Sequence, residues 1–191
     1  MASSLVLEDG TGLPNASTYE TAANVRLYAT ARGVQLAAED APGDALVDQM
    51  ITKGMDYLEA MRDKFQGWRM YPDVQALQWP RDGVLAEDRG YDCGVRNGYE
   101  NLVAGYTYRN PAIIPKELKQ ALCALTLQVK KGVDLQPTQV SGQFVTFKKI
   151  GPIERHFSEA VGIYTLPQMP LVEATLAPLL KYGGPLLSYR V

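Results

Sequence analysis

Residues 45–81 read ALVDQMITKGMDYLEAMRDKFQGWRMYPDVQALQWPR, and this stretch decides the fold. Its first part repeats apolar residues at steps of three and four, which is the spacing of one helical face. The positions on that face are Leu46, Met50, Gly54, Leu58 or Tyr57, Met61 and Phe65. The pattern predicts a long amphipathic helix. The two tryptophans that follow, Trp68 and Trp79, are interpreted as core anchors that fix the exit of the chain, and Pro80 favours an extended backbone at Trp79.

Length and composition indicate one domain over residues 1–191. A chain of this size buries roughly 70% of its unfolded surface on folding. The hydrophobic content of 46% and the charged content of 21% are ordinary for a globular protein. With 19 basic and 21 acidic side chains, the formal net charge is -2. This balance argues against a protein whose whole surface binds phosphates and leaves room for a local basic patch.

Cysteines and apolar runs indicate the compartment. Cys93 and Cys123 form neither a disulfide framework nor a zinc pattern, so we expect a reducing environment. The N-terminal residues lack the basic region and the long apolar run of a secretory signal. No apolar run approaches the ~20 residues that a membrane span needs. We therefore expect a cytosolic-type soluble protein with no membrane partner.

Three further helices are expected around the long one. A capping box of Ser17 and Glu20 predicts a helix over 18–32 that Gly33 stops. The next helix is expected over residues 115–131, with Pro115 as its first residue. Its core face holds Leu118, Leu122, Leu125 and Val129. Residues 170–180 form the last, bent or ended by Pro178. Residues 5–7 are interpreted as a short strand or an arm, and 9–15 as turns.

Three segments are expected to lie outside the helical core. Residues 86–110 contain four glycines, four tyrosines and three asparagines and predict a long loop, either a surface insertion or a contact surface in an assembly. Residues 143–157 predict a β-hairpin around Gly151 and Pro152. The hairpin has apolar residues on both faces, so it should pack on the domain or on a neighbour. Residues 183–191 form an apolar tail. The fold class is mainly α: a small helical bundle with a β-hairpin and extended terminal arms.

The hairpin also carries a basic cluster beside aromatic residues. The cluster is Lys148, Lys149, Arg155 and His156, near Phe144, Phe147 and Phe157. This interleaving could bind single-stranded nucleic acid by stacking and charge. It is equally compatible with a solvated edge whose lysines prevent strand pairing.

Catalytic and metal-binding patterns are sparse. His156 is the only histidine, which excludes two-histidine metal sites. The run 10–12, GTG, lacks the lysine of a phosphate loop and is interpreted as a turn. Asp40, Asp44 and Asp48 share one helical face, where they suit the helix dipole and solvent better than a metal. We expect no enzyme activity, no catalytic residue, no metal and no cofactor.

Five motifs in chain order resemble one protein family. They are VLEDGTGLPNASTY at 6–19, ARG at 31–33, ALQWPRDGV at 76–84, KIGPIE at 149–154 and LAPLL at 176–180. The chain resembles the head-tail connector proteins of tailed bacteriophages, also called adaptors or head-completion proteins. Members of that family are often labelled DnaT-like single-stranded DNA-binding. The segment 86–110 is longer than the family pattern.

The resemblance implies a structural virion protein in the neck, assembled in the host cytoplasm. It would form a homo-oligomeric ring of twelve subunits on the portal protein and contact a downstream tail or stopper protein. Double-stranded DNA would pass through the ring without specific contacts. The implied interfaces are the hairpin (Phe144, Val145, Phe147, Lys148, Lys149, Ile150), the tail (Leu186, Leu187, Tyr189, Arg190, Val191) and the loop (Tyr91, Tyr99, Tyr106, Tyr108). The alternative function is a single-stranded DNA-binding protein of phage replication.

Overall fold

The computed structural model describes residues 5–86, 108–136, 147–150, 153–156 and 169–181. The described part is mainly helical with a small β-hairpin, as the sequence predicts. In chain order the elements are α1 (Ala22–Thr30), α2 (Ala41–Ala60), the 3-10 helix η1 (Arg62–Lys64), β1 (Trp68–Arg69), β2 (Arg81–Asp82), α3 (Lys116–Lys130), β3 (Phe147–Ile150), β4 (Ile153–His156), α4 (Pro170–Leu176) and the 3-10 helix η2 (Ala177–Leu179).

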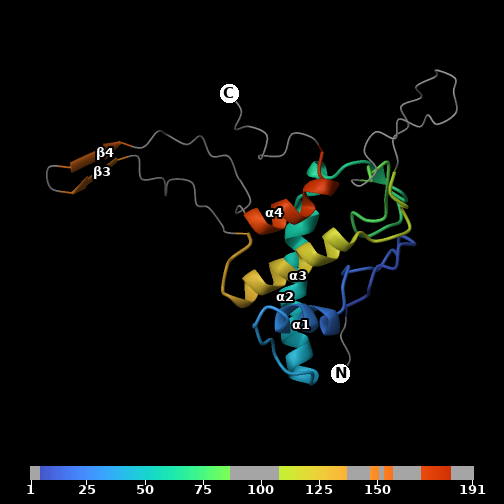
Figure 1. Ribbon diagram of the computed structural model, residues 1–191, viewed down its shortest axis with the longest axis horizontal. Helices are drawn as coiled ribbons and strands as arrows, with labels where there is room; N and C mark the ends of the chain where they lie inside the picture. The colour runs from blue at the N-terminus through green and yellow to red at the C-terminus, as the bar shows by residue number, and fades with distance from the viewer. Residues whose placement is uncertain (1–4, 87–107, 137–146, 151–152, 157–168, 182–191) are drawn as a thin grey trace, which may run out of the picture.

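The long helix α2 is the centre of the helical core. The helix α3 packs on α2, on α1 and on α4, and α1 also packs on α2. The other helices cross α2 at different levels along its length (Figure 1). At the crossing of α2 and α3, a Cβ atom on Gly54 would lie 3.1 Å from Leu122 Cδ1. A glycine at this position therefore lets the two helices approach closely.

The first half of the buried stripe of α2 lies one residue away from the predicted one, whereas the predicted positions from Gly54 onward are buried. The core positions are Val47, Ile51, Met55, Tyr57 and Leu58, followed by Met61 and Phe65. Leu46 is 50% exposed, and Met50 is only partly buried, so the prediction was wrong at these two positions. Both stripes satisfy the helical period at the start of α2, and the packing of α1 and α3 selects between them.

The start of α2 also differs from the prediction. The helix begins at Ala41, before the stretch 45–81, because the Asp40 carboxylate caps it by accepting from the Gly43 N–H at 2.7 Å. Asp44 pairs with Arg26 of α1 at 2.6 Å. Asp48 is buried, so the expectation that it faces solvent was wrong.

The helix α1 is shorter than predicted and has a different cap. It begins at Ala22, with Thr21 as the N-cap residue. Ser17 does not form the predicted capping box, because its hydroxyl accepts from the Val6 N–H at 2.9 Å. The predicted stop is confirmed: the Gly33 N–H donates to the Thr30 carbonyl, and Gly33 has a φ of 70°.

The N-terminal segment is organised by one buried carboxylate. Glu8 accepts hydrogen bonds from the backbone N–H groups of Gly10, Gly12 and Leu13 at 2.9 to 3.0 Å. The run 10–12 is therefore a structural turn, as predicted. Residues 5–7 form an extended arm whose contact with the core includes an isolated bridge between Leu7 and Thr18.

The C-terminal half follows the predicted order of elements. Pro115 precedes α3 as its N-cap residue instead of being its first helical residue. The predicted core face of α3 is buried at Leu118, Leu122 and Leu125, and Val129 is partly buried. The helix α4 ends at Leu176, and Pro178 lies in the 3-10 turn that follows, so the predicted ending is confirmed.

A buried hydroxyl ties three distant parts of the chain together. The Tyr19 hydroxyl donates to Glu59 Oε1 at 3.0 Å and accepts from the Trp79 N–H at 3.0 Å. The Gln78 N–H also donates to Glu59 Oε1, at 3.2 Å. Burial, and then the charge of Glu59, raises the pKa of Tyr19 far above its ordinary value. The hydroxyl therefore stays protonated and can act as a donor and an acceptor at once.

We predict that Tyr19→Phe lowers the free energy of unfolding by about 1–3 kcal/mol, because it leaves the buried Trp79 N–H without its acceptor. Chemical denaturation measures the change. Tyr28→Phe, which removes a hydroxyl from a partly buried ring on α1, is the control and should change stability little. An unchanged unfolding midpoint in Tyr19→Phe would contradict the structural role of this hydroxyl.

Glu59 predicts a pH dependence of stability. Burial raises the pKa of the Glu59 carboxyl, although hydrogen bonds from Gln78 and Tyr19 and the charge of Arg69 oppose the shift. Because its pKa is higher in the folded than in the unfolded state, Glu59 contributes to the stability at low pH. That contribution is lost as the pH rises through the pKa of the folded state. Glu59→Gln keeps an oxygen acceptor without the charge. We therefore expect the stability of Glu59→Gln relative to wild type to rise as the pH increases from below the ordinary pKa of a glutamate through the raised pKa of Glu59. Denaturation at a series of pH values measures it, and a pH-independent difference would be the contrary result.

Candidate nucleic-acid interface

The hairpin brings the basic cluster of the sequence together in two adjacent strands. The strands β3 and β4 are antiparallel, and their register places Lys148 opposite Arg155 and Phe147 opposite His156. Lys149 lies opposite an acid, Glu154, in the same ladder. Within the predicted hairpin the structure describes residues 147–150 and 153–156, and Phe144, Val145 and Phe157 lie outside the described residues. Figure 1 shows the hairpin apart from the four helices.

The segment of the predicted tyrosine-rich loop is fixed to the core at its base. Tyr91, Tyr99 and Tyr106 lie outside the described residues, whereas Tyr108 is 54% exposed. Tyr108 pairs with Leu85 in an antiparallel bridge. The neighbouring Arg109 donates to both carboxylate oxygens of Glu117, at 3.0 and 3.2 Å. The two ends of residues 87–107 are therefore held side by side on the helical core.

The Gln66 side chain joins this base to the beginning of the C-terminal tail. Its amide nitrogen donates to the Leu180 carbonyl at 2.7 Å, and its amide oxygen accepts from the Leu85 N–H at 3.2 Å. Two of the predicted interface segments thus leave the core at one place. The tail residues themselves, Leu186, Leu187, Tyr189, Arg190 and Val191, lie outside the described part of the chain.

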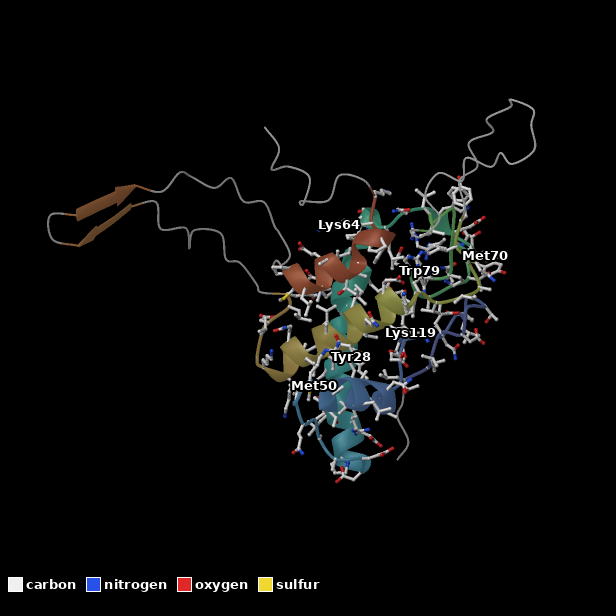
Figure 2. All side chains as sticks on the ribbon, in the orientation of Figure 1. Tyr28, Met50, Lys64, Met70, Trp79 and Lys119 are labelled. Carbon is white, nitrogen blue, oxygen red and sulfur yellow. The ribbon has the colours of Figure 1, made fainter. Side chains whose placement is uncertain are left out.

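The two tryptophans have opposite environments. Trp79 is 1% exposed, and its ring meets the Phe65 ring edge to face with the two centroids 5.4 Å apart. This burial agrees with the prediction that Trp79 is a core anchor. Trp68 is 64% exposed, and its prediction as a core anchor was wrong. The reason is the β1–β2 ladder, which pairs Trp68 with Asp82 at the edge of the fold. In Figure 2, Met70 lies at the outer edge of this region and Trp79 lies closer to the helices.

Glycines hold the chain around Trp68 in its conformation. Gly67 has a φ of 64°, and a Cβ atom there would lie on the Asp82 carbonyl oxygen. A Cβ atom on Gly83 would lie 2.9 Å from the six-membered ring of Trp68, so the indole occupies the space that a side chain would take. The Arg81 guanidinium donates to the carbonyls of Gln66 and Gly67, both at 2.8 Å. Burial lowers the pKa of Arg81 from its ordinary value.

A second exposed ring follows on the same segment. Tyr71 is exposed, and its ring lies where a side chain on Gly12 would begin. Met70 lies between Trp68 and Tyr71 in the sequence and is also exposed. We name these three residues, Trp68, Met70 and Tyr71, the Trp68 surface. The sequence did not predict this surface, although the run Tyr71-Pro72-Asp73 carries turn chemistry that is typical of a surface loop.

Cations lie just after the end of α2, close to Trp68 in the sequence. The Lys181 N–H donates a hydrogen bond of 2.8 Å to the carbonyl of Lys64, which is labelled in Figure 2. The Lys181 ammonium group donates to the Asp63 carbonyl at 3.0 Å. Lys64, Lys181 and Arg62 are all exposed. The C-terminal segment therefore adds a positive charge to this end of the core.

The described residues contain neither a metal-binding cluster nor a helix suited to cross a membrane. No group of three His, Cys, Asp or Glu side chains among them is arranged to hold a metal ion. Within the same residues, no helix combines the length and apolar character that crossing a membrane requires. His156 lies in β4, opposite Phe147 of β3.

Comparison with known proteins gives one family. A protein-family model described as "Putative DnaT-like ssDNA binding protein" matches residues 3–191. No curated protein and no solved structure matches the chain. Because the family model covers nearly the whole sequence, the chain belongs to the DnaT-like ssDNA binding protein family.

Proposed function

We propose that this protein binds single-stranded DNA without sequence preference. The observation that carries the proposal is the match of residues 3–191 to a family described by that activity. This was the alternative reading of the sequence, and the family match favours it over a structural role in the virion.

The β-hairpin supplies chemistry suited to the backbone of a single strand. Its register places Lys148 opposite Arg155 in neighbouring strands. Cations arranged in this way neutralise phosphates, and each phosphate contact releases counterions. With a net charge of -2 the whole chain does not attract DNA, so binding has to come from such a local cluster.

We predict that Lys148→Gln/Lys149→Gln weakens binding of a labelled oligothymidine and flattens its salt dependence. Loss of two phosphate contacts reduces the slope of log K against log salt by about 1.4. Fluorescence anisotropy over a salt series measures both quantities. Lys130→Gln/Lys131→Gln, an adjacent exposed lysine pair at the end of α3, is the matched control and keeps the wild-type slope. If wild-type protein does not bind the oligonucleotide at physiological salt, the proposed function is wrong.

A second candidate function is the twelve-subunit head-tail connector ring that the sequence motifs imply. One observation favours it: the hairpin lies apart from the helices of its own chain in Figure 1. Since its sequence has apolar residues on both faces, such a hairpin would gain stability by packing on a neighbouring subunit or on the portal protein. In this role the chain sits in the virion neck, contacts a downstream tail or stopper protein and lets double-stranded DNA pass.

The two candidates differ in oligomeric state and in location. We predict for the connector that mixing the purified protein with portal protein gives rings in negative-stain images and that virions contain the protein. A protein that stays monomeric with portal and is absent from virions would exclude this candidate. Binding to single-stranded but not double-stranded oligonucleotides, with no ring, would support the first.

A further inference from the structure

We infer that the Trp68 surface is a base-stacking site for single-stranded DNA, separate in sequence from the basic hairpin. The inference rests on the proposed function. It adds the place on the protein where the bases of the strand bind. It follows from three features of the described core: a fixed exposed indole, a second exposed ring on the same segment, and cations on and next to that segment.

The indole is held in place while most of its area stays in solvent. Trp68 is 64% exposed, yet its backbone is fixed on one side by the left-handed Gly67 and across the ladder by Asp82. Its ring rests against Gly83, where even a Cβ atom would be too close. An aromatic side chain that is already ordered loses little conformational entropy when a base stacks on it.

The second ring extends the platform. Tyr71 lies three residues further along the chain and rests against Gly12, which has a φ of 78°. The turn that contains Tyr71 is held by Arg69, whose guanidinium donates to the Pro72 carbonyl at 2.7 Å. Successive bases stack on separate aromatic side chains in proteins that bind single strands, and every base has a face that can stack.

The charges beside the rings favour a polyanion over a neutral partner. Lys64 lies four residues before Trp68, so their Cα atoms are no more than about 14 Å apart. Lys181 joins Lys64 through a backbone hydrogen bond, and Arg62 lies on the same 3-10 turn. Three acids lie on the same stretch, Asp63, Asp73 and Asp82, and the last accepts from the Gly83 N–H at 2.7 Å. The stretch 62–82 therefore carries four cations against three acids, and Lys181 adds a fifth cation beside Lys64.

The chain is suited to a direct test because it has two tryptophans in opposite environments. Trp79 is buried and Trp68 is exposed. Saturation with an oligothymidine should therefore quench the Trp68 part of the emission and leave the Trp79 part. In Trp68→Phe the quenching should disappear while the affinity, measured by anisotropy of a labelled oligonucleotide, stays within about threefold of wild type, because a ring remains for stacking.

Trp68→Ala should weaken the affinity by about 5- to 100-fold, which corresponds to the loss of one stacked base. Its salt slope should equal that of wild type, since no phosphate contact is removed; the hairpin variant changes that slope instead. Leu46→Ala, which truncates a half-exposed apolar side chain in the first half of α2, is the control and should bind as wild type does. Circular dichroism checks that each variant is folded.

The outcomes separate the inference from the proposed function. If wild type binds the oligonucleotide but Trp68→Ala binds it equally well, the inference is wrong and the proposed function stands. If Trp68→Ala instead changes only the oligomeric state, measured by light scattering, the Trp68 surface is a protein contact and the inference is again wrong. If wild type does not bind the oligonucleotide at all, both are wrong.

Discussion

The hydroxyl of Tyr19 is the contact on which the arrangement of the fold depends. It connects the segment before α1, the end of α2 and the segment that carries Trp79, three parts that are distant in the sequence. Because the hydroxyl both donates and accepts, no apolar residue could satisfy the buried Trp79 N–H and the Glu59 carboxylate together. This contact fixes residues 78–81, and with them the strand that pairs with Trp68.

Arg81 of that strand and the neighbouring Gln66 hold residues that flank the segments outside the core. The Arg81 guanidinium holds the carbonyls of Gln66 and Gly67, and the Gln66 amide holds Leu85 and Leu180. The base of residues 87–107 and the start of the C-terminal tail therefore depend on one another. A change at Gln66 would act on both segments at once, whereas the hairpin is connected to the core elsewhere, between α3 and α4.

The two candidate functions use different parts of this molecule. Binding of a single strand needs cations and open aromatic rings, which the hairpin register and the Trp68 surface supply. A ring subunit needs surfaces that repeat around an axis, and the hairpin that stands apart from its own helices suits that requirement. The near-neutral chain is compatible with both, because a local cluster can hold phosphates without making the whole protein basic.

The sequence by itself determined the class of fold, the order of the helices, the hairpin and the glycine stop at Gly33, because these follow from local periodicity and turn chemistry. Only the tertiary structure decided which stripe of α2 is buried and which tryptophan is exposed. Leu46 and Val47 both fit the helical period, and Trp68 and Trp79 are the same residue type, so local pattern cannot rank them. Packing on α1 and α3 buries Val47, while the ladder with Asp82 places Trp68 at the edge of the fold. The candidate stacking site therefore follows from long-range contacts that no local pattern encodes.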